Sequence, residues 1–208
     1  MIRLGAICYT RLPEAETLVL RLGIPAAEAV AAGRRGKARS ETLLGFYLLA
    51  QMLPNADLSQ IARAGNGRPY LVGRPEADFN FSHAKGAVVC AVELTESGDA
   101  PRVGVDAERL FGRSREEMER IVKRWFTPAE QARWQADPTE LTFLSVWTAK
   151  EAVAKRAGGG IRDLRQIDTE SLDRVAVASY RLGCAVVSLA HGLGRAAPRE
   201  IERFGMPE

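Results

Sequence analysis

The order of helix and strand signals constrains the fold of this chain more than any other feature. The second half contains three capping patterns in succession, each with a capping residue three positions before a glutamate, at residues 114–117, 127–130 and 137–140. We expect the third helix to continue to about Ala157, where Gly158 and the two glycines after it end it. Strands and helices do not alternate regularly, which favours an α+β fold over a doubly wound parallel sheet.

Apolar runs bounded by turn residues predict the other elements. Residues 87–94 and 102–106 predict two strands around a turn at 97–99, and residues 175–182 and 184–190 predict a closing hairpin. In the first half, residues 26–32 favour a helix, residues 33–39 form a basic loop, and residues 40–53 indicate a mostly buried helix that Pro54 ends.

Composition excludes several classes of protein. Of the 208 residues, 46% are hydrophobic and 26% are charged, which is ordinary for a globular protein and unlike a disordered or fibrous one. The net charge of +3 suits an anionic partner without requiring one. No apolar run approaches the length needed to cross a bilayer, and the N-terminus lacks a signal-peptide pattern, so we expect a cytoplasmic protein. Cys8, Cys90 and Cys184 have no CxxC spacing and are expected to be reduced core residues.

Two segments place carboxylates where they could hold a metal ion. Asp106 and Glu108 point to one face if their strand continues through them, and a divalent cation would relieve their repulsion. On a helix, Trp147, Glu151 and Lys155 fall on one face with Lys150 beside it. A solvated strand end and an ordinary Glu–Lys helix pair are the alternatives for these two segments.

Two further segments could bind an anion. Ser82 and His83 are adjacent on an extended run, where neighbouring side chains diverge, so an anion clamp is more plausible than a Ser–His nucleophile pair. A strand-end turn with a satisfied histidine is the alternative. The cluster at residues 34–39 is either a solvated basic loop or a site of phosphate capture from a cofactor or nucleic acid; its cations are Arg34, Arg35, Lys37 and Arg39.

Together and in this order, the segments resemble the larger, two-lobed class of 4′-phosphopantetheinyl transferases. The matching blocks are Gly-Arg-Pro at 67–69, Phe-Asn-Phe-Ser-His at 79–83, Gly-Val-Asp-Ala-Glu at 104–108, Phe-Thr-Pro-Ala-Glu at 126–130 and Trp-Thr-Ala-Lys-Glu-Ala-Val-Ala-Lys at 147–155. The resemblance implies transfer of phosphopantetheine from coenzyme A to a serine of an apo acyl or peptidyl carrier protein, with Mg²⁺ as cofactor. It also implies two similar α+β lobes, residues 1–100 and 101–208, with coenzyme A in the cleft between them. Because both lobes would belong to one chain, a monomer would be sufficient to form the cleft.

The resemblance also assigns roles to residues. Asp106, Glu108 and Glu151 match the Mg²⁺-binding acids, Lys155 matches the lysine that contacts the pyrophosphate, and Glu151 is the candidate base for the carrier serine. Ser82 and His83 match the pair that contacts coenzyme A phosphates, and Arg68 stands where the family usually has lysine. Thr42 would lie near the adenine, with the cations of residues 34–39 near the 3′-phosphate. Trp147 and Lys150 belong to the motif, and Lys150 is expected to face the cofactor.

Two other functions compete with this hypothesis. Another Mg²⁺-dependent phosphoryl or nucleotidyl transferase could use the same acids on a nucleotide. A basic nucleic-acid-binding protein is a weaker alternative, because the charge excess is slight and basic and aromatic residues are not interleaved. The sequence does not indicate which carrier protein would be modified.

Overall fold

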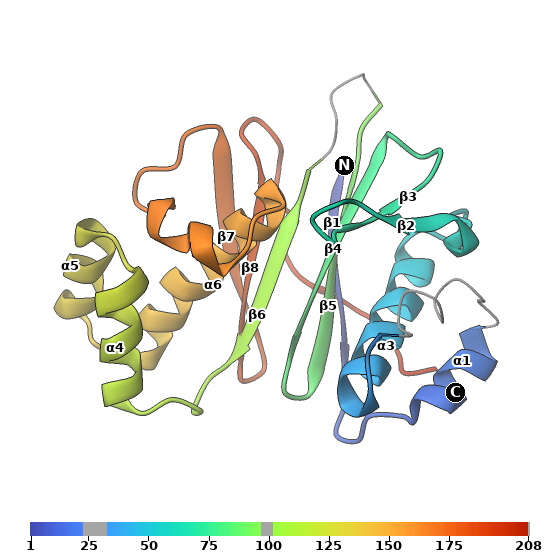
Figure 1. Cartoon of the computed structure of the whole chain (residues 1–208), viewed down its shortest axis with the longest axis horizontal. Helices are drawn as coiled ribbons and strands as arrows, with labels where there is room; N and C mark the ends of the chain where they lie inside the picture. Colours follow the sequence, from blue (N-terminus) through green and yellow to red (C-terminus); the bar gives the residue numbers. More distant parts are fainter. Residues whose placement is uncertain (23–32, 97–101, 208) are drawn as a thin grey trace.

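The computed structural model describes residues 1–22, 33–96 and 102–207, and it has the expected α+β architecture (Figure 1). The helices are α1 (Ala15–Leu22), α3 (Gly36–Met52), α4 (Arg115–Trp125), α5 (Pro128–Ala136) and α6 (Glu140–Ala157), with short 3₁₀ helices at Leu58–Gln60 and Ile161–Gln166. The strands are β1 (Ile2–Cys8), β2 (Ile61–Arg63), β3 (Pro69–Leu71), β4 (Ala77–Ala84), β5 (Ala87–Leu94), β6 (Gly104–Arg109), β7 (Val175–Leu182), β8 (Ala185–Gly192) and β9 (Glu202–Arg203). No helix in these described ranges is long and apolar enough to span a membrane.

The first sheet has the strand order β4-β5-β1-β9. β5 is antiparallel to both β4 and β1, whereas β9, from the C-terminal end of the chain, runs parallel to β1. Helix α3 packs on this sheet through Leu44, Leu48 and Met52, which are almost completely buried with Phe79 and Cys90. The C-terminal segment therefore returns to the sheet in which the chain begins.

The second sheet has the order β6-β8-β7, and all its pairings are antiparallel. Helix α6 covers it, and the side chains of Phe143, Leu144 and Val146 are fully buried. Thr139 caps the start of this helix, and Gly158 ends it in the left-handed conformation with φ of 77°. Burial of α6 on most of its sides supplies the stability that helix propensity alone cannot.

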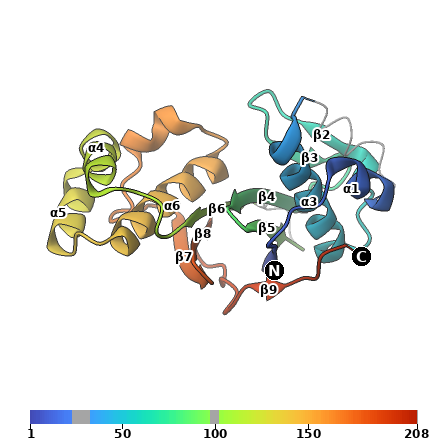
Figure 2. The same cartoon turned by 90° about the horizontal axis from the view of Figure 1, so that it is seen from below.

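β4 and β6 lie side by side between α3 and α6, although their backbones do not pair (Figures 1 and 2). Alternate side chains of β4 accept from backbone amides at alternate positions of the facing segment: Asp78 from Val103 N at 2.8 Å, Asn80 from Val105 N at 2.9 Å and Ser82 from Ala107 N at 3.2 Å. We call this row of hydrogen bonds between β4 and residues 103–107 the seam. Behind the seam, apolar side chains of the two sheets form one cluster that includes Leu4, Val89, Val105 and Leu189. The seam therefore joins the sheets without a continuous backbone ladder.

The structure confirms the strand predicted at residues 87–94 and the closing hairpin. It corrects two other predictions. Helix α3 begins at Gly36, inside the predicted basic loop, because its first turn continues a helix whose next turns are buried. The cap of α6 is Thr139, whose hydroxyl accepts from Thr142 N, and not Asp137. Residues 80–83 lie within β4, which confirms the predicted extended run and excludes the alternative of a strand-end turn.

Of the predicted core cysteines, Cys90 is buried, but Cys8 and Cys184 are free thiols exposed at the surface. Cys8 is the last residue of β1, and Cys184 lies in the turn between β7 and β8, where a side chain has little to pack against. The predicted helix at residues 26–32 and the turn at 97–99 lie outside the described residues.

Contact between α6 and β6 is close enough to require glycine at position 104. A Cβ added to Gly104 would lie 2.0 Å from Ala152 O and 2.5 Å from Arg156 N, and neither backbone atom can move without the helix. We predict that Gly104→Ala lowers the free energy of unfolding by about 3 kcal/mol, measured by urea denaturation. Gly65→Ala is the control, because nothing lies within 4 Å of its added Cβ, and it should change stability by less than about 0.5 kcal/mol. Equal stability of the two variants would contradict this packing.

Candidate functional site

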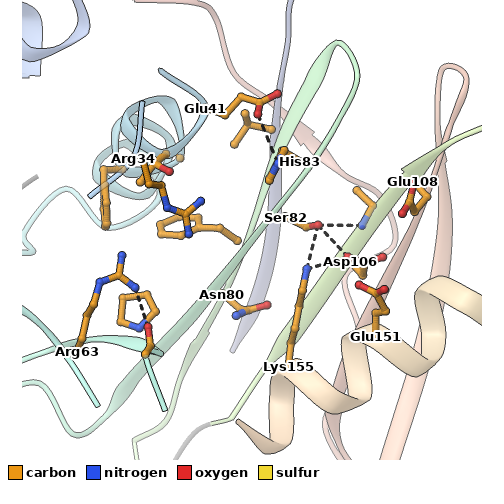
Figure 3. Close-up of a pocket in the computed structure, with 18 residues that line it drawn as sticks. Arg34, Glu41, Arg63, Asn80, Ser82, His83, Asp106, Glu108, Glu151 and Lys155 are labelled. Carbon is orange, nitrogen blue, oxygen red and sulfur yellow. Dashed lines mark hydrogen bonds and ion pairs between the residues drawn. The ribbon is translucent and has the colours of Figure 1, made fainter. Parts of the chain in front are cut away.

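A cavity of about 470 Å³ lies over the seam between β4 and β6 (Figure 3). α3 supplies one wall, the β2–β3 hairpin borders it, and α6 supplies the opposite wall. Its polar and charged lining side chains are Arg34, Glu41, Thr42, Arg63, Asn80, Ser82, His83, Asp106, Glu108, Glu151 and Lys155. Many of these residues come from separate sequence motifs, which the fold brings together in one place.

Lys155, Asp106 and Ser82 form a hydrogen-bonded cluster at the seam (Figure 3). Lys155 Nζ lies 2.7 Å from Asp106 Oδ1 and donates also to Ser82 Oγ at 3.1 Å and Val105 O at 3.2 Å. Ser82 Oγ donates to Asp106 Oδ1 at 2.9 Å. The Asp106 side chain is 5% exposed, whereas that of Lys155 is 31% exposed. Lys155 therefore pairs with a buried carboxylate and still presents its ammonium group to the cavity.

Three carboxylates line the cavity near the seam, and they differ in their free oxygen atoms, burial and pKa. Asp106 Oδ2 is buried and has no hydrogen-bond partner, so it is an acceptor available for a ligand. Glu108 is half-buried and contacts Arg113 at 3.0 Å through one oxygen only. Burial, more than the charge of Asp106, raises the pKa of Glu151 to about 7. Burial also raises the pKa of Glu108.

These acids fit a divalent cation that completes its coordination with substrate oxygens. No three acidic, histidine or cysteine side chains in the described part of the chain are close enough to enclose a metal ion by themselves. Mg²⁺ usually binds one or two carboxylates and takes its remaining ligands from water and substrate phosphates. Asp106 has an unpartnered oxygen and Glu151 has a raised pKa, and both features are compatible with a cation at this point of the cavity.

Glu41 holds His83 at the α3 side of the cavity. The Glu41 carboxylate is 5% exposed; it accepts from Tyr9 Oη at 2.8 Å and lies 3.4 Å from His83 Nε2 and 3.2 Å from Lys37 Nζ. Burial lowers the pKa of His83, although the Glu41 charge opposes that shift. Glu41 was not predicted, because an isolated glutamate in a helix belongs to no motif.

The predicted basic cluster divides between two cavities. Arg34 and Thr42 line the main cavity, and Thr42 Oγ1 donates to Ala38 O within α3. Arg35, Lys37 and Arg39 line a second cavity of about 490 Å³ against Glu14 and Glu16, and Arg34 borders both cavities. The Arg39 guanidinium lies 3.2 Å from Glu16. Only part of the cluster therefore faces the cavity that holds the acids.

Arg63 in β2 was not predicted, yet it lines the main cavity with Arg34 (Figure 3). Burial and the nearby charge of Arg34 lower its pKa, as expected where two cations face one space. Sequence offers no signal for Arg63, because the fold alone brings the β2–β3 hairpin over α3.

Arg68 was predicted to contact the cofactor, but its guanidinium is hydrogen-bonded to other parts of the protein and does not line the main cavity. Its guanidinium bonds to Asp78 Oδ2 at 2.5 Å, Val103 O at 2.6 Å and Lys155 O at 2.5 Å. Arg68 therefore links the hairpin, the seam and the end of α6. Its planar fork allows these several bonds at once, which a lysine could not make in the same way.

Lys150 also lies away from the cavity. Its side chain is fully buried, its Nζ is 2.6 Å from Glu130 Oε2, and it donates to the backbone carbonyl of Ile167. Glu130 also accepts from Thr169 N and Thr169 Oγ1, both at 2.8 Å. Trp147 is buried in the core, where it stacks on Phe143. Of the helical motif, Glu151 and Lys155 reach the cavity, whereas Trp147 and Lys150 stabilise the helix that carries them.

Comparison with known proteins confirms the resemblance to 4′-phosphopantetheinyl transferases at the level of the superfamily. Residues 102–192 match the model of the 4′-phosphopantetheinyl transferase superfamily. A 4′-phosphopantetheinyl transferase of Bacillus subtilis is 35% identical over 98 residues, which are 46% of this chain and 39% of that protein. The 4′-phosphopantetheinyl transferase HetI of Nostoc sp. is 36% identical over 93 residues, 43% of this chain and 36% of that protein.

A third relative matches over a longer region. The 4′-phosphopantetheinyl transferase AcpT of Salmonella typhi is 26% identical over 156 residues, 74% of this chain and 77% of that protein. The chain thus matches less than two thirds of the first two relatives and a larger share of the third. The superfamily match includes Asp106, Glu108, Glu151 and Lys155, the residues of the cavity that α6 and β6 supply.

The buried ion pair leads to a prediction about Lys150. Replacing Lys150 by Met leaves the Glu130 charge buried without its partner, so we expect a loss of about 3–5 kcal/mol in the free energy of unfolding, measured by urea denaturation. Arg115→Met is the control, because the exposed Arg115–Glu119 pair should contribute no more than about 1 kcal/mol. A stable Lys150→Met protein that had lost only ligand affinity would contradict the structural role.

The raised pKa of Glu151 predicts a pH-dependent stability. A carboxyl group with a pKa of about 7 in the folded state and about 4.5 in the unfolded state binds its proton more tightly when folded. Its charge destabilises the metal-free protein fully above pH 7, and the destabilisation disappears as the pH falls toward 4.5. Glu151→Gln should therefore be more stable than the wild type at pH 8, and the difference should shrink by pH 5. Urea unfolding of both proteins at pH 8 and pH 5 measures this difference in the free energy of unfolding. The same difference at both pH values would contradict the raised pKa of Glu151.

Proposed function

We propose, from the confirmed resemblance to the 4′-phosphopantetheinyl transferase superfamily, that this chain transfers the 4′-phosphopantetheine arm of coenzyme A to a serine of an apo carrier protein. The observation that carries the proposal is the Lys155–Asp106 pair, 2.7 Å apart, in one cavity with Glu108 and Glu151. This arrangement combines a cation for phosphate oxygens, acids for a metal ion and a carboxylate that could accept a proton.

We also propose the two-lobed architecture of the larger class, with residues 1–100 and 101–208 as the lobes. Its support is that each half contains an antiparallel sheet covered by one long helix, α3 in the first and α6 in the second. The pairing of β9 with β1 attaches the end of the second lobe to the first. In this proposal the cavity over the seam is the cleft for coenzyme A, and a single chain is sufficient.

The cations of the cavity suit the separate phosphate groups of coenzyme A. Lys155 and Ser82, with His83 beside them, would contact the pyrophosphate next to the acids. Arg34 and Arg63, which line the same cavity from α3's side and the hairpin, would contact the 3′-phosphate, with Thr42 toward the adenine. Charge-assisted bonds to phosphate oxygens are the strong hydrogen bonds of such sites.

In the proposed reaction the carrier serine Oγ bonds to the β-phosphorus of coenzyme A. The bond from that phosphorus to the bridging pyrophosphate oxygen breaks, and adenosine 3′,5′-bisphosphate leaves with the electron pair. Glu151 accepts the serine proton, directly or through water. Lys155 stabilises the charge that develops on the leaving group.

Asp106, Glu108 and Glu151 would hold Mg²⁺, which when bound supplies positive charge against the pyrophosphate. Asp106 is suited to this by its unpartnered Oδ2, and Ser82 keeps the other oxygen in place. Arg113 fixes one oxygen of Glu108 and leaves the second available.

The test of the proposal mixes this protein, coenzyme A and Mg²⁺ with a panel of unmodified carrier proteins of fatty acid, polyketide and nonribosomal peptide systems. Intact-mass measurement should show the gain of one phosphopantetheine arm on at least one carrier. No gain on any carrier, with the protein folded, would contradict the proposed function.

The acid site leads to a prediction that separates it from a solvated strand end. Asp106→Ala should leave the protein folded and reduce transfer by a factor of at least about 10²–10³, because it removes a preorganised electrostatic group. Glu151→Gln should be similarly inactive, because the amide neither accepts the serine proton nor binds a hard cation well. Single-turnover rates and circular dichroism measure both effects. Glu116→Gln, an exposed acid in the first turn of α4, is the control and should retain the wild-type rate.

A further inference from the structure

Two exposed thiols lie at the same edge of the two sheets. Cys8 ends β1 in the first sheet, and Cys184 lies in the turn between β7 and β8 of the second sheet; both are free thiols at the surface. The end of β1 and this turn lie together at the lower edge of the molecule in Figure 1. The fold therefore brings to one place two cysteines from opposite ends of the chain.

Both cysteines adjoin the apolar cluster between the sheets. Cys8 occupies the same face of β1 as Ala6, because side chains alternate along a strand, and Ala6 belongs to that cluster. Cys184 lies between Leu182 and Ala185, which are also members of the cluster. The two cysteines are thus carried by packed segments, yet their side chains remain exposed, as a thiol must be in order to react.

A groove of about 640 Å³ is lined by both cysteines and by three cations. The cations are Lys37, Lys85 and Arg109, and no acidic side chain of the described residues lines the groove. Lys37 lies 3.2 Å from Glu41, whereas Lys85 and Arg109 are exposed and form no ion pair in the part of the chain that the structure describes. A groove of this volume accommodates a small molecule, and its charge favours an anion.

We propose that this groove is a modification site, where Cys8 or Cys184 reacts with a small anionic disulfide and retains one half of it. The cysteine loses its proton to water, and its thiolate sulfur bonds to one sulfur of the disulfide. The sulfur–sulfur bond of that molecule breaks, and its other half leaves as a thiolate with the electron pair and then takes up a proton. The disulfide is itself the oxidant, so the exchange requires no further reactant.

The cations favour this reaction in two ways. They attract the carboxylates or phosphates of the disulfide into the groove, and they stabilise the negative charge that passes to the departing thiolate. A metal ion is a poorer occupant, because the described residues contain no group of three histidine, cysteine or acidic side chains that could hold one. The groove shares no lining residue with the main cavity, so the inference does not depend on the proposed function.

The first test incubates the folded protein with three disulfides: glutathione disulfide, which carries carboxylates, coenzyme A disulfide, which carries phosphates, and cystamine, which is cationic. Intact mass and peptide mapping give the rate at each cysteine, divided by its rate in the urea-unfolded protein, which has no groove. On this scale at least one anionic disulfide should react about tenfold faster than cystamine. The faster anionic probe shows whether the groove prefers carboxylates or phosphates.

The position of the adduct is part of the same test. It should be found on Cys8 or Cys184 and not on Cys90, which is fully buried in the core, and dithiothreitol should remove it. A protein that combines Cys8→Ser with Cys184→Ser should gain no adduct. Both substitutions replace exposed side chains, so the double variant should unfold at the wild-type urea concentration.

The cations have their own measurement. Lys85→Glu and Arg109→Glu should each slow the reaction with the preferred anionic disulfide by about threefold or more at low salt and accelerate the reaction with cystamine, and both differences should narrow at high salt. Lys123→Glu is the control, because it changes the net charge equally from an exposed position on α4 outside the groove, and it should leave both rates unchanged. Three results would each overturn the site: no adduct on Cys8 or Cys184, cystamine reacting as fast as the anionic disulfides, or an equal effect of Lys123→Glu.

Discussion

Three β4 side chains take the place of a backbone ladder and hold the two sheets together. Asp78, Asn80 and Ser82 each present an oxygen to a backbone amide of the facing segment. Side-chain acceptors keep the sheets adjacent but leave the two strands without direct backbone pairing. Helices α3 and α6 lie on either side of the seam, and the cavity lies between them. The apolar cluster behind the seam supplies the burial that makes this arrangement stable.

The same seam explains the electrostatics of the cavity. Ser82 is at once a member of the ladder and a hydrogen-bond donor to Asp106, so the sheet junction fixes the buried carboxylate. Lys155 compensates the charge of Asp106, which leaves Glu151 with too little positive charge to offset its own burial. The three acids share two nearby cations, Lys155 and Arg113, and these offset the burial of Glu151 only in part.

The motif on helix α6 contains residues that face the core and residues that face the cavity. Lys150 and Trp147 face the core, where the Lys150–Glu130 pair connects α6 to α5 and to the chain after the second 3₁₀ helix. Glu151 and Lys155 face the cavity. Glu140, in the first turn of the same helix, accepts from the backbone amides of residues 111–113, in the loop after β6. One helix therefore positions the acid and the lysine and also holds this loop.

Local sequence determined the elements that depend on local physics. The Ser114 and Thr127 caps, the glycine end of α6 and the closing hairpin each follow from a few neighbouring residues, and the structure confirms them. The motifs likewise indicated Asp106, Glu108, Glu151 and Lys155, because their spacing is preserved on a strand and a helix. Tertiary structure alone decided the rest. Arg68 and Lys150 form structural bonds and Arg63 and Glu41 line the cavity because side-chain surroundings arise from segments distant in sequence, and no local pattern encodes which of them meet.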